Sequence, residues 1–277
     1  MSSIPAASVL ASICALHAGS ARAQERVLPA VPRYELPAAS PRVHALAGRV
    51  LSVEQGDSRF GSDTEAEVAL GENFPLLMLK GGERPIALGF GSQVYARFSL
   101  SDSKSSLISH DWVVGVNATA ALGRWDVTVE LFHESSHLGD EYGDRFHVSR
   151  LDWTREVGAL WVGYRTGGWR MSGSASYVLL DELGLERPAF AWALDWRGGP
   201  LMRMLDGQIR PLAGIYTEAA GATGWRVSTS AKLGITLPSG SGRELGIALI
   251  AHDGLSTQRQ FFRSESRYVG MEVRFDL

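Results

Sequence analysis

The sequence predicts an all-β fold, an antiparallel transmembrane β-barrel of about twelve strands of the outer-membrane type. Apolar and polar residues alternate along segments of ten or more residues, which is the length a tilted membrane-spanning strand needs. Short glycine-containing turns alternate with longer polar segments along the chain, as in bacterial barrels. No window of 18 or more apolar residues follows residue 23, so a membrane-spanning helix is excluded there and a closed barrel is the remaining way to cross.

The alternation is clearest over residues 225–237. Odd positions such as Val227 and Leu233 are apolar, and even positions such as Ser228 and Lys232 are polar or small. Such a strand has one apolar and one polar face. The expected strands are 86–100, 110–121, 124–137, 146–166, 169–180, 188–197, 203–216, 225–237, 243–252 and 269–277, and a hairpin of 43–53 and 63–70 makes twelve. Residues 71–85 are expected to be an irregular periplasmic connection.

The connections predict which end of the barrel faces which side. Four are short: Gly123, Gly167-Gly168, Gly198-Gly199-Pro200 and 238–242. The longer, more polar ones are 101–107, 138–146, 181–186, 217–223 and 254–266. Bacterial barrels have short periplasmic turns and longer outer loops, so the second set is expected outside the cell. A soluble β-sandwich or lipocalin-like barrel is the alternative, but its strands would be shorter.

Both ends of the chain are expected to carry targeting signals. Residues 1–23 are expected to be a signal peptide, with an apolar stretch and an Ala21-Arg22-Ala23 cleavage site,. Its Cys14 is the only cysteine, and a thiol-free mature chain suits the oxidising periplasm. Residues 24–42 are expected to be a Pro-rich periplasmic extension or linker, and 43–277 the barrel.

The final strand also bears on partners. Its last residues alternate up to Phe275 and Leu277, which resembles the signal read by the barrel-assembly machinery, so that machinery is an expected partner. Localisation in the outer membrane follows, with its lipids and lipopolysaccharide as further partners. The formal net charge of −3 gives no basic excess, so nucleic acid is not expected as a partner.

One segment concentrates chemically active side chains. Residues 132–142 read FHESSHLGDEY, and residues 150–156 read RLDWTRE. The first block resembles the HxSSHLGDE[FY] signature of a "domain of unknown function" family of Gram-negative outer-membrane β-barrel proteins. The second resembles that family's next strand, with Asp152 and Thr154 where Asn and Ser are usual. The resemblance implies a membrane barrel and supplies no activity. It marks these signature residues besides the catalytic candidates: Ser136, His137, Glu141, Tyr142, Arg150 and Glu156.

The parity of the strand over residues 124–137 predicts where the signature points. Its odd positions are apolar at Val127, Val129 and Leu131, so they face lipid. His133, Ser135 and His137 continue the odd series and are expected to face outward at the outer-leaflet rim.

A serine and a histidine two residues apart stand side by side on one face, where the imidazole can activate the hydroxyl if a third group orients it. The predicted site has Ser135 as nucleophile, His133 as base and Asp152 as orienting group, since a hairpin centred near Tyr142 would place Asp152 opposite His133. Asp140 and Glu141 are the alternatives for the third group.

The arrangement is similar in geometry to outer-membrane phospholipase A and to the lipid A 3-O-deacylase barrels, although the Asn-Gly that follows the pair in the phospholipase is absent. The parity of 146–166 leaves Asp152 open, because Leu151 and Trp153 favour odd outward positions whereas Leu160 and Val162 favour even ones.

These observations leave three functional hypotheses. The first is a serine-dependent lipid or lipopolysaccharide esterase or deacylase. The second is a non-enzymatic, narrow or plugged barrel, serving as a structural protein or small-solute channel. The third is a metal site, in which His133, His137, Asp140 and Glu141 hold zinc, or the two acids hold calcium. Their spacing matches no established metal motif, so no cofactor is expected, with calcium as the weak alternative.

Overall fold

The computed structural model describes residues 26–27, 35–43, 45–55, 63–81, 84–101, 104–204, 207–238 and 244–276. The expected signal peptide, residues 1–23 with Cys14, lies outside these residues. No helix among them is long and apolar enough to cross a membrane.

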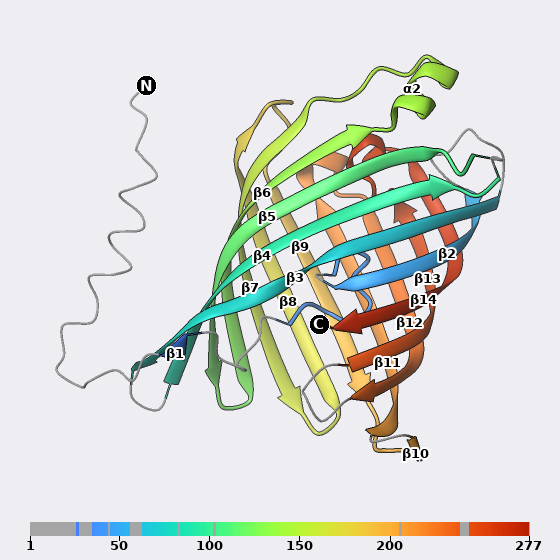
Figure 1. Ribbon diagram of the computed structural model, residues 1–277. Helices are drawn as coiled ribbons and strands as arrows, with labels where there is room; N and C mark the ends of the chain where they lie inside the picture. The colour runs from blue at the N-terminus through green and yellow to red at the C-terminus, as the bar shows by residue number, and fades with distance from the viewer. Residues whose placement is uncertain are drawn as a thin grey trace, which may run out of the picture.

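Within the described residues, twelve antiparallel strands form a closed barrel (Figure 1). The barrel strands are β2 (Leu46–Gln55), β3 (Asp63–Gly81), β4 (Arg84–Ser99), β5 (Leu107–Leu122), β6 (Trp125–Leu138), β7 (Trp153–Thr166), β8 (Trp169–Asp181), β9 (Pro188–Arg197), β11 (Gly207–Ala220), β12 (Val227–Pro238), β13 (Glu244–Leu255) and β14 (Glu265–Asp276). Each pairs with its sequence neighbour, and the β14–β2 pairing closes the ring. The smaller elements are β1 (Arg26–Val27), β10 (Met202–Met204), α2 (Asp140–Phe146), η1 (Gly221–Thr223) and η2 (Arg259–Phe261). The predicted fold class is confirmed.

The hairpin between β3 and β4 corrects one expectation. Residues 71–85 were expected to be irregular, but β3 continues to Gly81 and β4 begins at Arg84, with Lys80 opposite Pro85. The register shifts between Pro75 and Leu77, so a bulge absorbs the break in alternation that made this segment look irregular. The hairpin extends beyond the ring and pairs there with β1 (Figure 1).

The strand faces separate as a membrane barrel requires. Large apolar side chains are exposed on the outside, among them Val50, Leu70, Val116, Val129, Leu160, Met171, Trp192, Leu233, Leu249 and Met271. Charged side chains are buried on the inside, where they form ion pairs: Arg49 with Glu67 and Glu272, Lys232 with Glu272, Arg97 with Glu65 and Glu67, and Arg155 with Asp181. Because the exposed face is the apolar one, the ring is suited to a lipid environment,.

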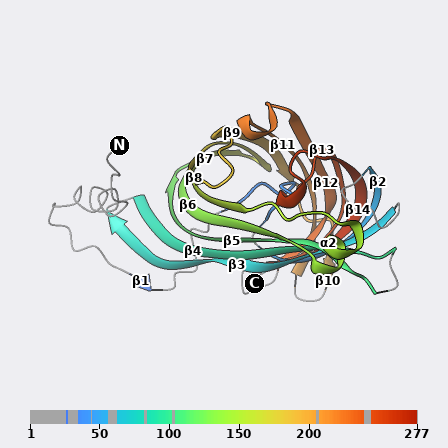
Figure 2. The same ribbon diagram turned by 90° about the horizontal axis from the view of Figure 1, so that it is seen from above.

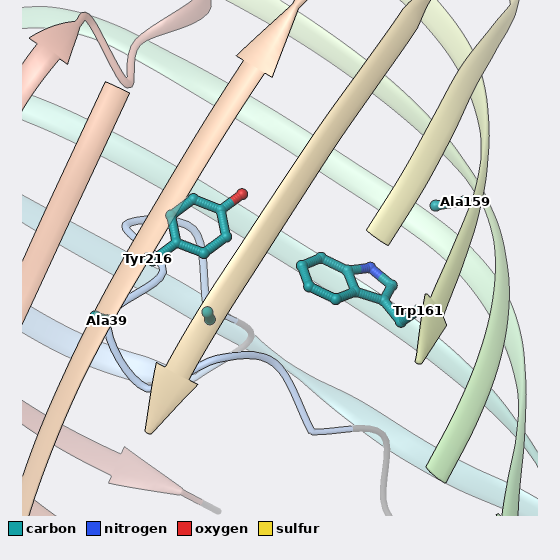
Figure 3. Close-up of a cluster of buried hydrophobic side chains, with 5 residues drawn as sticks. Ala39, Ala159, Trp161 and Tyr216 are labelled. Carbon is teal, nitrogen blue, oxygen red and sulfur yellow. The ribbon is translucent and has the colours of Figure 1, made fainter. Parts of the chain in front are cut away.

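Residues 35–43, which include the last part of the expected linker at 24–42, fill part of the lumen, whereas residues 24–25 and 28–34 lie outside the described residues. The Ala38 backbone N–H donates to Asp195 Oδ1 at 3.0 Å, and the Pro41 carbonyl accepts from Arg49 Nη1 at 2.7 Å. Ala39 packs with Trp161 and Tyr216, which point into the barrel (Figure 3). The segment is Pro-rich and has no periodicity, so it forms neither strand nor helix. Its small side chains fit the space inside the barrel.

A second segment enters the lumen from the end of the barrel that carries α2. The connection between β13 and β14, residues 256–264 with η2, folds inside the ring (Figure 2). Gln258 reaches Ser109 on β5, and Arg259 reaches Glu134 on β6. In the described residues, the lumen is therefore occupied from both ends. We call residues 35–43 the N-terminal plug and 256–264 the mouth loop.

Candidate functional site

The signature begins on β6, whose two faces are clearly distinguished. Glu134 and Ser136 are buried toward the lumen, whereas His133, Ser135 and His137 are partly exposed on the outer face. The outward orientation predicted from the parity of this strand is confirmed. All of these positions lie near the end of β6 that leads to α2.

His133 has an acidic partner on the neighbouring strand. β7 places Glu156 opposite His133, and His133 Nδ1 lies 2.8 Å from Glu156 Oε1. The two side chains are 35% and 43% exposed. A carboxylate only accepts hydrogen bonds, so it fixes the imidazole with its proton on Nδ1 and leaves Nε2 as the lone-pair nitrogen.

Ser135 lies in the next row of the same outer face. It pairs with Trp112 on β5 and with Thr154 on β7. Along a strand, residues two apart are about 7 Å apart at their Cα atoms, a separation that the two side chains can span. Among the described residues, no hydrogen bond joins Ser135 to His133. The position of the Ser135 hydroxyl is therefore set by the backbone of β6 alone.

The structure corrects the expected position of Asp152. Asp152 does not lie opposite His133: its side chain is 84% exposed, and its Oδ1 is 3.9 Å from Arg150 Nη2. The prediction was wrong because it centred the hairpin near Tyr142, whereas the pairing of His133 with Glu156 places the centre between Asp144 and Arg145. The helix α2 occupies this connection and delays the start of β7.

The other acidic alternatives also lie elsewhere. Asp140 and Glu141 form the first turn of α2 and are exposed. The structure also shows which residues of β7 face outward. Its even positions do so from Thr154 to Leu160, whereas Trp153 is buried in the lumen. The irregularity is a register shift between β7 and β8 near Glu156, so it does not disturb the pairing with β6.

The remaining signature residues hold this part of the barrel together. Tyr142 is buried and packs against Phe146 and Phe261. Gly139 passes so close to β5 that a Cβ would lie 1.9 Å from the Leu107 carbonyl oxygen, so only glycine fits. Ser136 is buried, and its carbonyl accepts from Gln260 Nε2 at 3.0 Å.

The inward side chain of Glu134 joins both lumenal segments directly behind the outward pair. Its Oε1 lies 3.0 Å from Arg42 Nη2 in the N-terminal plug and 2.8 Å from Arg259 Nε in the mouth loop. Its Oε2 accepts from Trp153 Nε1 at 3.0 Å. Neither Arg42 nor Arg259 carries a sequence signal that connects it with this strand, since both lie in irregular segments.

A further outward row lies above Ser135, at the end of the strands. His110 on β5 pairs with His137 on β6, and their ring centroids are 5.1 Å apart. Trp112 Nε1 lies 2.8 Å from His110 Nδ1, and Arg150 Nη1 lies 3.4 Å from His137 Nδ1. Sequence reasoning missed His110, although the tight turn at Gly123 would have placed it opposite His137.

The four residues considered as metal ligands lie on two different elements. His133 and His137 project from β6, whereas Asp140 and Glu141 project from α2. In the part of the chain that the structure describes, no group of three or more His, Asp or Glu side chains is arranged to hold a metal ion. The expectation on cofactors stays a prediction.

A closed antiparallel barrel with an apolar outer band and a filled polar lumen defines the outer-membrane class of β-barrel. Within that class, the chain belongs to the family described as "Protein of unknown function (DUF1207)", whose model matches residues 7–277. Membership in a domain-of-unknown-function family, inferred from the signature, is confirmed at that level. A search of curated protein sequences gives no match.

Solved outer-membrane phospholipases are similar in fold. The outer membrane phospholipase A of Escherichia coli has a TM-score of 0.58 at 14% identity, over 84% of this chain and 92% of the other. The dimer of the Salmonella typhi outer membrane phospholipase with bound calcium also has a TM-score of 0.58, at 15% identity over 86% and 93% of the two chains. At such identities the likeness establishes the fold alone.

Proposed function

We propose that the protein is a serine-dependent acyl hydrolase of the outer membrane, acting on phospholipids or lipopolysaccharide of the outer leaflet. One observation carries the proposal. His133 is tied through Nδ1 to the Glu156 carboxylate, and Ser135 stands two residues away on the same outward face. This is the order of groups that a nucleophile, a general base and an orienting acid require.

The reaction follows from the roles of these three groups. Ser135 Oγ attacks the acyl carbonyl carbon, and His133 Nε2 accepts the hydroxyl proton. Glu156 holds the required tautomer and stabilises the imidazolium that forms. The bond between the acyl carbon and the leaving alcohol then breaks, and His133 returns the proton to the leaving oxygen. Water, activated by the same imidazole, hydrolyses the acyl-Ser135 ester and regenerates the enzyme.

The position of the site supports a lipid substrate. Below it on the outer surface lie exposed apolar side chains such as Val129, Leu131 and Leu160, and beyond it lie α2 and the longer loops. An acyl chain lying along the barrel wall would therefore place its ester beside Ser135. The solved structures with a similar fold are phospholipases, which agrees with an ester of a membrane lipid as the substrate.

Export and assembly complete the proposal. Residues 1–23 would direct the chain across the inner membrane, and β14 would be read by the barrel-assembly machinery. The short turns would face the periplasm, and α2 with the mouth loop would face outward.

The alternative is a plugged barrel without enzymatic activity. Arg42 and Arg259, which meet at Glu134 inside the lumen, favour a structural protein over a small-solute channel within this alternative. It predicts that no change in lipid composition follows from changes in the outward residues.

Lipid analysis distinguishes the two. We expect cells or reconstituted membranes containing the protein to accumulate lyso-lipids or deacylated lipid A by mass spectrometry, and the Ser135→Ala variant to abolish this. Ser52→Ala is the matched control, because Ser52 is an exposed outward serine near the same end of β2, with Val50 and Glu54 as its same-face neighbours. Identical lipids with the wild-type and Ser135→Ala proteins would overturn the enzymatic proposal.

A further inference from the structure

We propose that His110, His137 and Arg150 form a phosphate-binding site that holds the headgroup of the substrate lipid above Ser135. The inference rests on the proposed function for its role in catalysis, but the binding site itself can be tested without it. We call these three residues the rim cluster.

The rim cluster presents hydrogen-bond donors. An indole N–H only donates, so the contact from Trp112 Nε1 makes His110 Nδ1 an acceptor,. A guanidinium likewise only donates, so Arg150 makes His137 Nδ1 an acceptor,. Neutral His110 and His137 therefore both carry their proton on Nε2, so each ring offers one N–H donor, and Arg150, which lies at the Nδ1 edge of His137, adds a cation.

Donors without a strong competing acceptor suit an anion. The Arg150 side chain is 56% exposed, and its ion pair with Asp152 is long, at 3.9 Å, with the aspartate almost wholly in solvent. Exposed pairs of this kind are weak, so a ligand can displace Asp152. Arginine recognises phosphate well because its planar group offers two parallel N–H donors.

The rim cluster lies at the correct level for a lipid headgroup. His137 is two residues beyond Ser135 on the same face, and Ser135 is two beyond His133. With about 7 Å per two residues and a strand tilt of roughly 45°, each row is about 5 Å higher in the membrane than the previous one. A phosphate at the rim cluster would thus place an ester a few bonds below it at Ser135, while the acyl chain continues past Val114 and Leu131.

The chemistry defines a class of substrate: an acylated lipid with a phosphate close to its ester. A glycerophospholipid and a phosphorylated, acylated glucosamine such as lipid A both meet this description. A neutral glyceride does not meet it, because it has no phosphate that the rim cluster could bind.

Binding to the inactive Ser135→Ala protein tests the site separately from hydrolysis. The probes are short-chain phosphatidylglycerol, lipid A, the matching diacylglycerol and inorganic phosphate, measured by calorimetry and native mass spectrometry in an uncharged detergent. We expect at least one phosphorylated lipid to bind at least about tenfold more tightly than diacylglycerol, and the added changes Arg150→Gln and His137→Gln to remove that preference. Preference for phosphatidylglycerol or for lipid A identifies the source of the phosphate.

The control is Arg226→Gln in the same Ser135→Ala background, since Arg226 is a similarly exposed arginine, 50%, beside another connection at the same end of the barrel. Heat-dependent electrophoretic mobility verifies that each variant is a folded barrel. Equal binding of diacylglycerol and the phospholipids, or a loss with Arg226→Gln as large as with the rim changes, would overturn the site.

The active protein gives a second readout. With Ser135 present, Arg150→Gln should raise KM for the phosphorylated lipid while leaving kcat/KM for a phosphate-free acyl ester unchanged. Phosphate-dependent binding without any hydrolysis by the wild-type protein would keep the rim cluster and reject the proposed function. Hydrolysis that is unchanged by substitution of Arg150 and His137 would keep the proposed function and reject the rim cluster.

Discussion

The two faces of β6 differ in how their side chains are held. On the lumen face, Glu134 is buried and contacts Arg42, Arg259 and Trp153. On the outer face, His133 has Glu156 as its polar partner, and Ser135 has none among the described residues. Reactive groups gain from being free of competing contacts, provided that the backbone beneath them is rigid. In this strand, the lumen face provides the rigidity, and under the proposed function the outer face provides the reactive groups.

This contrast also accounts for the composition of the signature. Alternate residues of HESSH serve different purposes because adjacent side chains of a strand point to opposite sides. His133, Ser135 and His137 belong to the outer surface, whereas Glu134 and Ser136 belong to the lumen. Mutations at neighbouring positions should therefore fall into two classes, one affecting activity and one affecting folding.

The largest expected effect is on the outer face. Glu156→Gln should lower the rate of lipid hydrolysis by about 10²–10⁴-fold, because an amide no longer favours the tautomer and the imidazolium that His133 needs. Its thermal unfolding should change little, because the pair is substantially exposed,. Rates on a defined phospholipid, with Asp152→Asn as the control, measure this. Equal losses for both variants would remove the distinction between Glu156 and Asp152.

The opposite result is expected on the lumen face. Glu134→Ala leaves the cations of Arg42 and Arg259 without their shared carboxylate, so the free energy of unfolding should fall by about 3–5 kcal/mol. Urea unfolding in detergent micelles measures the loss, and Ser135→Ala should stay within about 0.5 kcal/mol of the wild type. Similar stabilities for the two variants would show that the lumen contacts of β6 do not support the strand.

The adjacent serines offer a smaller and sharper comparison. Ser136 Oγ is buried and has no hydrogen-bond partner among the described residues, so Ser136→Ala removes an unsatisfied hydroxyl. Stability should be unchanged or should rise by up to about 1 kcal/mol, and lipid hydrolysis should persist. Loss of hydrolysis in Ser136→Ala, with Ser135→Ala still active, would exchange the roles of the two residues.

How much of this site could be predicted depends on how far apart in the sequence the interacting residues are. Alternation along one strand is local, so the outward direction of Ser135 follows from the sequence. The tight turn at Gly123 likewise fixes the register between β5 and β6. The pairing of His133 with Glu156 was missed because α2 lies in the intervening connection, and a seven-residue helix moves the hairpin centre without changing the pattern of either strand.

The lumen was harder to predict for the same reason. The alternation along the strands predicts that charges such as Arg97 and Lys232 face inward. The spacing of the turns predicts the order of strands and loops. The N-terminal plug, residues 35–43, has no periodicity, and its contacts with Asp195 and Glu134 join residues distant in sequence. Nothing local distinguishes such a segment from a linker.

The smallest expected effect concerns the beginning of this plug, where the Glu35 carboxylate pairs with the exposed Arg165 and the Glu35 carbonyl accepts from the buried Arg170. Burial opposes ionisation of Glu35, but Arg165 and Arg170 outweigh it and hold the pKa of Glu35 below its ordinary value of 4.5. Since the pKa is lower in the folded state, this contact stabilises the barrel above about pH 4.5, and the contribution is lost as the pH falls through the folded-state value. The Glu35 side chain is 40% exposed, so the contribution should not exceed about 1 kcal/mol.

We therefore expect Glu35→Gln to be slightly less stable than the wild type at pH 7, and the difference to shrink progressively on acidification from about pH 4.5 toward pH 3,. Unfolding midpoints measured over this range test the expectation, with Glu141→Gln on the exposed first turn of α2 as the control. A difference that does not shrink on acidification would mean that Glu35 contributes through packing and not through its charge, and the plug would then be held by contacts such as that of Ala38 with Asp195.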